Sequence, residues 1–400
     1  MDAERFARLE ALFQEAVQLS GDERVAFLQR SCGDDMDLRE ELRSLIAAHD
    51  EGDDMLDRSA ARRRPEQGRL AETRIGPYKL LRKIGEGGMS EVYLAVRADD
   101  EYQKRVALKI IRQDLDREEM LRRFRIERQI LAGLNHPNIA TMFDGGTTED
   151  GLPFFVMEFI DGTPIDVYCD DNGLSLSRRV ELFRTVCSAV QFAHQNLVIH
   201  RDIKASNILV TADGTPKLLD FGIAKLMNPD HLAGEMEFTL TGVRPMTPRY
   251  ASPEQIEGRH VGTPSDIYSL GVLLYLLLTG TRPHRLKGRP AGDQGRIILE
   301  EEVERPSTVV TGSDTTIPNI DQSQLKKQLS GDLDNILLKT LRKEPQRRYP
   351  SVEHFSEDLR RHMAGLPVMA RKDTFGYRAN KFIRRNLLGV SAAATILVLL

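Results

Sequence analysis

The sequence is poor in cysteine and in net charge, and both shortages exclude whole classes of protein. Its 400 residues contain three cysteines, Cys32, Cys169 and Cys187, which are scattered and odd in number. They form neither a disulfide framework nor a Cys-x-x-Cys metal pair, so we expect a reducing, cytoplasmic environment. The formal net charge is only −4. This excludes a strongly basic nucleic-acid binder, and no nucleic-acid partner is expected.

Long apolar runs are also scarce, and the clearest one stands at the end of the sequence. No secretory signal is visible, because residues 1–10 are charged throughout. Residues 387–400 form an apolar run of 14 residues, and a bilayer span needs about 20. Because the run stops abruptly, we interpret it as the start of a single-pass helix that anchors the chain to the inner membrane. The basic residues 371–386 would then lie on the cytoplasmic side. A helix packed on the globular domain and an interfacial anchor are the alternatives.

Composition divides the rest of the chain into four segments. Residues 1–56 carry 15 acidic and six basic side chains and show apolar residues at helical spacing, which predicts a small helical module. That module either packs on its neighbour or binds a regulatory partner. Residues 57–74 contain Pro, Gly and an Arg run without apolar periodicity, which is typical of a linker. Residues 75–365 form a globular domain that begins with strands and continues mostly as helices, and residues 366–386 form a basic juxtamembrane segment.

A glycine-rich loop lies between two predicted strands. Its residues 84–90 (IGEGGMS) follow an alternating stretch that begins at Tyr78, and they precede the β-branched and aromatic stretch 92–96. A dinucleotide-binding loop would lead into a helix instead. A hairpin of this kind can lay its backbone N–H groups over phosphates, because glycine has no Cβ to block close approach. Ser90 departs from the pattern, which has a third glycine there.

Lys109 lies inside the apolar stretch 106–111, which predicts a strand. An ammonium group in that setting needs an anion to offset its desolvation. Phosphate oxygens and a carboxylate would both serve. Glu127, on a helix predicted over residues 124–131, is the candidate carboxylate.

A polar loop with three reactive side chains lies within residues 198–209, between an apolar strand that leads in and another that leads out. Asp202 could accept a hydroxyl proton, Lys204 could neutralise a phosphoryl group, and Asn207 offers an oxygen to Mg²⁺. Asp220, thirteen residues after Asn207, ends another apolar strand and is followed by Phe-Gly. A carboxylate at that position is a good Mg²⁺ ligand.

Together, these four motifs resemble the signature set of a protein kinase. The resemblance covers about residues 78–363, and the strings GEGGM, FVMEFIDG and GDLDNI are similar to bacterial serine/threonine kinases of the eukaryotic-like, Hanks type. It implies an α+β, bilobal fold with a small β-rich N-terminal lobe, holding one main helix, and a larger helical C-terminal lobe. It also implies an enzyme that transfers the γ-phosphoryl of Mg-ATP to Ser or Thr hydroxyls of protein substrates.

The same resemblance assigns the chemical roles. Asp202 would orient and deprotonate the attacking hydroxyl, and Lys204 would stabilise the γ-phosphoryl. Asn207 and Asp220 would bind Mg²⁺.

For the nucleotide, the resemblance implies that Lys109 holds the α- and β-phosphates and pairs with Glu127. The backbone of Glu158 and Ile160 would hydrogen-bond adenine, with Met157 at the gatekeeper position. The complete set implied for nucleotide binding is Ile84, Gly85, Glu86, Gly87, Gly88, Val92, Ala107, Lys109, Glu127, Met157, Glu158 and Ile160.

Two contacts outside the reaction centre are implied as well. Glu254 should pair with Arg348, and Asp266 should brace the catalytic loop.

Regulation is expected in the segment between Asp220 and Glu254. Thr239 and Thr241 lie there, and Arg201 precedes the catalytic aspartate. A phosphate on either threonine could pair with that guanidinium, so we expect autophosphorylation at Thr239 or Thr241, in trans if two kinase domains dimerise. The alternative is that both are plain polar loop residues.

Two other functional classes are less favoured by the sequence. A pseudokinase scaffold binds partners without phosphoryl transfer, and it is favoured by loss of any of Lys109, Asp202, Asn207 or Asp220. All four are present. A small-molecule phosphotransferase is disfavoured by the long activation segment and its Ser-Pro-Glu ending.

Overall fold

The computed structural model describes residues 31, 73–87, 90–98, 104–111, 129, 133–221, 248–286, 289–310, 317, 321–372 and 374–386. Contacts gather Pro65–Arg285 and Ile298–Leu400 into one compact unit, whereas Leu286–Ile297 belongs to a second unit. Several predictions fall outside the described residues. They concern the helices expected within residues 1–56 and 124–131, and the apolar run 387–400.

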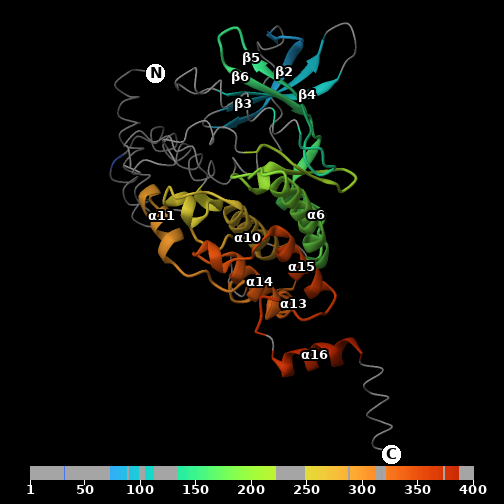
Figure 1. Ribbon diagram of the computed structural model, residues 1–400, viewed down its shortest axis with the longest axis vertical. Coiled ribbons are helices and arrows are strands. Elements are labelled where there is room, and N and C mark those ends of the chain that lie inside the picture. The colour runs from blue at the N-terminus through green and yellow to red at the C-terminus, as the bar shows by residue number, and fades with distance from the viewer. Residues whose placement is uncertain are drawn as a thin grey trace, which may run out of the picture. The chain divides into compact units, whose positions relative to one another are not determined.

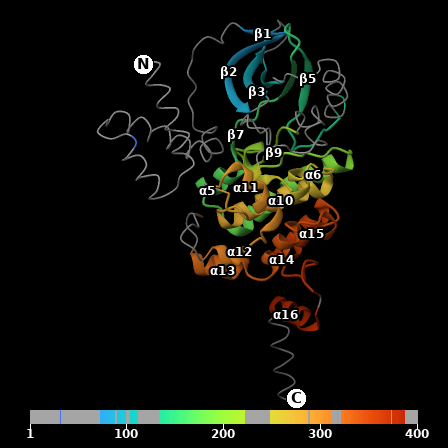
Figure 2. The ribbon, with the colours of Figure 1, turned by 90° about the vertical axis from the view of Figure 1, so that its left-hand side faces the viewer.

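A six-stranded antiparallel sheet forms the N-terminal lobe, in the order β1-β2-β3-β4-β6-β5 (Figures 1 and 2). Its strands are β1 (Arg74–Ile75), β2 (Tyr78–Gly87), β3 (Ser90–Arg97), β4 (Arg105–Ile111), β5 (Met142–Thr147) and β6 (Pro153–Glu158). Alternation and β-branched content predicted β2, β3 and β4, and all three are confirmed. Buried side chains such as Leu80, Leu108 and Val156 form a separate core in this lobe.

The C-terminal lobe is mainly helical and also holds a small sheet of β7, β8 and β9. The small sheet consists of β7 (Gly162–Pro164), β8 (Ile208–Thr211) and β9 (Pro216–Leu218). The helices are α5 (Ile165–Asp171), α6 (Leu176–Gln195), α9 (Pro253–Ile256), α10 (Thr263–Thr279), α12 (Pro306–Val309), α13 (Gln322–Leu329), α14 (Asp332–Thr340), α15 (Val352–Met363) and α16 (Phe375–Arg385). Single 3-10 turns are η1 (Ala205–Asn207), η2 (Pro248–Tyr250) and η3 (Pro345–Arg347), and α11 (Ala291–Glu300) begins in the other unit.

Helix α10 is the centre of this lobe, and Figure 1 shows it among the other helices. It is apolar on nearly every side, because α6, α12 and α14 all pack against it. Gly271 permits the approach of α14, since a Cβ there would lie only 2.7 Å from Thr340 Oγ1. The helix ends where Gly280 adopts φ 73°, a left-handed cap that glycine takes without steric cost.

The strand predicted at residues 198–199 is wrong. This stretch is irregular, because its backbone takes part in the C-terminal cap of α6. The Val198 N–H donates a hydrogen bond to Ala193 O at 2.9 Å. Just before it, Leu197 has φ 61° and its side chain is 93% exposed. A leucine in the left-handed region carries steric strain that Asn or Gly avoids.

Replacing this leucine should therefore stabilise the protein. We expect Leu197→Asn to raise the free energy of unfolding by about 0.5–1 kcal/mol, because asparagine tolerates the left-handed conformation. Urea unfolding measures the change. Leu81→Asn, at an exposed leucine on β2, is the control and should give no gain. An unchanged or lower stability for Leu197→Asn would contradict the strain argument.

Among the described residues, no helix combines the length and the apolarity that crossing a bilayer requires.

Candidate active site

Lys109 is held inside the sheet and faces the second lobe. It lies in the middle of β4 and is only 8% exposed. Its Nζ is 3.0 Å from Asp220 Oδ1, which lies just after β9. The predicted partner Glu127 lies outside the described residues. The structure therefore joins two of the predicted residues, 111 positions apart in the sequence, across the two lobes.

The register of the sheet aligns several residues of the predicted nucleotide set. Gly85 pairs with Val92, and Val92 pairs with Lys109 on the next strand. Ala107 in turn pairs with Met157 of β6. Ile84, Glu86 and Gly87 lie on the same stretch of β2, whereas Gly88 falls outside the described residues.

Gly85 is not required by the fold itself. A Cβ at this position would meet Val92 Cβ at 3.5 Å, which is ordinary van der Waals contact. Its φ is not in the left-handed region either. The absence of a side chain is therefore best explained by a ligand that approaches the backbone, as a phosphate would.

The end of β6 and the residues that follow it are fixed by an ion pair that the sequence did not suggest. The Glu158 carboxylate accepts two hydrogen bonds from Lys217 Nζ of β9, both at 3.1 Å, and one from the Thr141 N–H at 3.2 Å. Ile160 lies just beyond and is buried. Because the carboxylate is turned toward β9, the backbone of residues 158–160 is held in a fixed position beside Met157.

Asp266 of α10 braces the catalytic loop, as predicted. Its carboxylate accepts hydrogen bonds from the backbone N–H groups of His200 and Arg201, both at 2.8 Å. His194 Nε2 lies 2.8 Å from the same group. Burial opposes the charge, but the hydrogen bond and charge of His194, with the His200 contacts, hold the pKa of Asp266 below its ordinary value. The buried carboxylate thus stays ionised and fixes the loop.

The brace allows a backbone conformation that would otherwise be costly. Arg201 has φ 65°, in the left-handed region, and Gln255 Nε2 of α9 donates to its carbonyl at 3.0 Å. Strain of this kind persists only where surrounding contacts over-determine it. At this position the left-handed conformation of Arg201 turns the next residue, Asp202, toward the other reactive side chains.

Asp202, Lys204 and Asn207 meet in this loop. Asn207 Nδ2 donates to the Asp202 carbonyl at 2.8 Å and to its Oδ2 at 3.1 Å. Lys204 Nζ lies 3.4 Å from the same carboxylate oxygen. These contacts hold the three side chains that the sequence singled out in one cluster.

His200 links this cluster to Asp220. Its Nε2 lies 2.9 Å from Leu219 O and its Nδ1 accepts from the Asp202 N–H at 3.3 Å, which together indicate a neutral ring protonated on Nε2. Complete burial lowers the pKa of His200 and keeps it neutral. Its ring packs on Phe221 at 4.8 Å between centroids. The role is structural, as expected of a single histidine without a second ligand nearby.

The donor set at Asn207 and Asp220 suits a hard cation. Asp220 has φ 44°, and its buried Oδ1 is the oxygen that contacts Lys109 Nζ at 3.0 Å. The nitrogen of the Asn207 amide is used by Asp202, which leaves its oxygen for a ligand. No group of three His, Cys, Asp or Glu residues gathers as a metal site among the described residues, at this position or at any other. A cation here would complete its shell with phosphate oxygens and water, as Mg²⁺ prefers.

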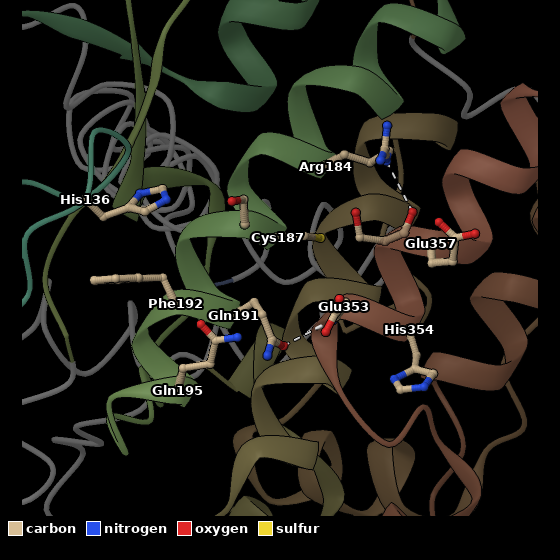
Figure 3. A pocket seen from close by; sticks show the side chains of 11 residues that line it. His136, Arg184, Cys187, Gln191, Phe192, Gln195, Glu353, His354 and Glu357 are labelled. Atoms are coloured by element: carbon tan, nitrogen blue, oxygen red, sulfur yellow. Dashed lines mark hydrogen bonds between the residues drawn. The ribbon is translucent and has the colours of Figure 1, made fainter.

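A pocket of about 720 Å³ lies elsewhere, between α6 and α15 (Figure 3). His136, Cys187 and Glu353 are among the residues that line it, and none of the predicted site residues does. Burial raises the pKa of the Cys187 thiol, which disfavours the reactive thiolate. We therefore place the candidate chemistry at the Lys109–Asp220 junction.

Comparison with known proteins agrees with this geometry. Residues 78–359 match the family described as protein kinase domain. The chain is 37% identical over 300 residues to the serine/threonine-protein kinase PknB of Mycobacterium leprae, covering 74% of this chain and 44% of the relative. It is 33% identical over 327 residues to a probable serine/threonine-protein kinase PknB of Bifidobacterium longum, covering 78% of this chain and 44% of the relative.

A similar solved structure supports the assignment of the fold, and of the fold only. The crystal structure of Rad53 1-466 in complex with AMP-PNP has a TM-score of 0.51 at 22% identity, covering 70% of this chain and 64% of that one. The chain spans less than half the length of the curated relatives it matches.

Proposed function

Because the chain belongs to the protein kinase family, in its bacterial Hanks-type branch, we propose that it transfers the γ-phosphoryl group of Mg-ATP to Ser or Thr hydroxyls of protein substrates. The observation that carries the proposal is the junction of Lys109 with Asp220, beside the cluster of Asp202, Lys204 and Asn207. These five side chains are the ones that phosphoryl transfer requires at a common site.

The proposed roles follow from the contacts of each group. Asp202, held by Asn207, accepts the proton of the attacking hydroxyl. Lys204, 3.4 Å from Asp202, places positive charge beside the transferred group. Lys109 holds the α- and β-phosphates beneath the glycine-rich loop. Mg²⁺, when bound by Asn207 and Asp220, neutralises charge on the phosphate oxygens.

Incubation with labelled ATP and a generic protein substrate tests the proposal. We expect label on Ser and Thr of the substrate, in a reaction that needs a divalent cation. A chain that binds ATP and substrate but incorporates nothing would instead be a scaffold of the pseudokinase type. Label transferred to small molecules alone would indicate the phosphotransferase reading.

Activation by autophosphorylation is part of the same proposal, with Thr239 and Thr241 as the sites. Neither lies within the described residues. Arg201, braced by Asp266 and Gln255, is the cation that a phosphate there would meet. Phosphopeptide mass spectrometry of active protein should find one of the two modified, and Thr239→Ala/Thr241→Ala should lower activity severalfold. Active protein that carries neither phosphate would contradict this.

We also propose that a single-pass helix beginning near Leu387 anchors the kinase domain on the cytoplasmic side of the inner membrane. Its support is the apolar composition of residues 387–400 and the basic residues that precede them. Dimerisation of the kinase domain for phosphorylation in trans, and the domain bounds given by composition, are proposals of the same kind.

A further inference from the structure

Helix α16 is clasped to the C-terminal lobe through one buried carboxylate. Asp332, the first residue of α14, is 7% exposed, and its Oδ1 accepts a hydrogen bond from Tyr377 Oη at 3.0 Å. Lys381 Nζ lies 2.6 Å from its Oδ2. Tyr377 Oη also accepts from the Val368 N–H at 3.1 Å. Both Tyr377 and Lys381 belong to α16, so these contacts fix which side of the helix faces the lobe.

Further cations surround the clasp. His362 Nδ1 and Arg371 Nη1 both lie 3.7 Å from the Asp332 carboxylate. The Arg371 guanidinium also stacks over the Tyr377 ring at 4.4 Å. Burial opposes ionisation of Asp332, but His362, Lys381 and Tyr377 outweigh it and hold its pKa well below the usual range. The carboxylate is therefore charged at physiological pH, which favours its contacts with the surrounding cations.

The opposite side of α16 is apolar and exposed. Phe375 is 89% exposed, Phe382 56% and Ile383 44%. At about 100° per residue, Phe375 and Phe382 fall within about 20° of one another, on the side away from Tyr377 and Lys381. Three large apolar side chains on one helix face are more than the scattered single exposures of an ordinary surface.

One edge of this face is basic. Arg378 and Arg385 are exposed, and each follows a phenylalanine by three residues, so both lie on the same edge at about 60° from Phe375 and Phe382. The whole helix, Phe375–Arg385, carries four basic residues and no acidic one. An apolar stripe with a cationic edge is typical of helices that lie in the headgroup layer of an anionic bilayer.

We propose that the outer face of α16, made by Phe375, Arg378, Phe382, Ile383 and Arg385, is a binding site for an anionic phospholipid surface. The aromatic and aliphatic side chains enter the headgroup layer while the guanidinium groups pair with lipid phosphates. The clasp at Asp332 then holds the C-terminal lobe against the bilayer in one orientation. The apolar residues 387–400 follow directly, which places this face at the membrane in the proposed topology, but α16 binds through its own residues.

Charge and composition favour lipid over a protein partner. A second copy of this chain would have to offer an apolar surface with an acidic edge to match the arginines. An anionic bilayer offers both features everywhere on its surface, and each basic residue adds to the attraction.

Vesicle flotation of the 400-residue chain tests the site. The vesicles contain phosphatidylcholine alone or with phosphatidylglycerol. We expect the parent to bind the anionic vesicles, with affinity falling at high salt. Arg378→Glu/Arg385→Glu and Phe375→Ser/Phe382→Ser/Ile383→Ser should each weaken that binding at least tenfold.

Two matched controls are available. Lys326→Glu/Lys327→Glu makes the same charge change at exposed lysines of α13, and Leu81→Ser removes an exposed apolar side chain from β2. Both should bind like the parent, and all variants should keep the parent's activity in solution.

Three results would overturn the proposal. Binding of the α16 variants equal to that of the parent would assign membrane contact to residues 387–400 alone. Equal binding of the parent to neutral and anionic vesicles would remove the role of charge. Unchanged vesicle binding of the variants, together with loss of self-association in light scattering, would make this face an interface between copies. Vesicle binding does not require phosphoryl transfer. A parent without kinase activity would therefore refute the proposed function, and the vesicle assay would still test the lipid-binding site.

Discussion

Asp202→Asn should reduce phosphate incorporation by about 10²–10⁴-fold, the range that a positioned general base contributes. The amide cannot accept the hydroxyl proton, although it has the size of the carboxylate. It can still accept the hydrogen bond that Asn207 Nδ2 now donates at 3.1 Å, so the loop should keep its conformation. Steady-state assays with labelled ATP should show the loss in kcat, with little change in KM for ATP, because the groups proposed to hold the nucleotide, Lys109 and the backbone after β6, are unchanged.

Asp213→Asn is the matched control for this experiment. Asp213 lies in the exposed turn between β8 and β9, where it accepts hydrogen bonds from Thr211 and Thr215. It is eleven residues from Asp202 and belongs to the same lobe. Its amide variant should be as active as the parent. Equal activity of Asp202→Asn and the parent would remove Asp202 from the mechanism, and no activity in either would point to a scaffold.

The sequence predicted most of the site because its chemistry is local. Lys109, Asp202 and Asp220 each stand at the end or centre of a strand or loop that short-range patterns identify. The bracing contacts are long-range. That Asp266 and the pair Glu254–Arg348 act as braces was implied by resemblance, and hydrogen bonds at 2.7–2.8 Å confirm both.

Other features escaped sequence reasoning for physical reasons. The pairing of Lys217 with Glu158 joins two strands 59 residues apart and leaves no periodic signal. Residues 198–199 are apolar, as a strand would be, but this short stretch follows directly on α6 and Val198 caps the end of that helix. Helix α16 lay in a segment read only for its positive charge, although Thr374 caps it and Phe375 and Phe382 are seven residues apart. That spacing was the signal from which an amphipathic helix could have been predicted.

The buried pair of Glu254 and Arg348 should be the most sensitive point of the C-terminal lobe. The two side chains are 6% and 0% exposed, and Arg348 donates to both carboxylate oxygens at 2.7 and 2.8 Å. Its remaining donors reach three backbone carbonyls, and Ser265 Oγ donates to Glu254 at 2.7 Å. Every group is satisfied, so removal of one partner leaves an uncompensated buried charge.

We expect Arg348→Met to lower the free energy of unfolding by about 3–5 kcal/mol. Activity should fall too, because Gln255, next to Glu254, holds the Arg201 carbonyl. Glu254→Met/Arg348→Met should be less destabilised than Arg348→Met, since it buries no lone charge. Arg360→Met, at an exposed arginine paired with Glu357, is the control and should show no resolvable change. A double variant as unstable as the single one would show that the cost lies in packing.

The pH dependence separates the two causes further. Burial opposes the charge of Glu254, but Arg348 and Ser265 outweigh burial and lower the pKa of this carboxyl group. The ion pair with Arg348 therefore stabilises the fold fully above the ordinary carboxyl pKa. This stabilisation is lost as the pH falls through the lowered pKa of the folded state. Without Arg348, only hydrogen bonds from Ser265 and the backbone still oppose the effect of burial, and we expect the pKa of Glu254 in the folded state to rise. The variant's carboxyl then takes up a proton at a higher pH and sheds its uncompensated charge. The stability difference between the parent and Arg348→Met, measured by urea unfolding, should therefore shrink from neutral pH toward pH 4.5, the ordinary value for Glu. A difference that is constant over this interval would assign the loss to packing and not to charge.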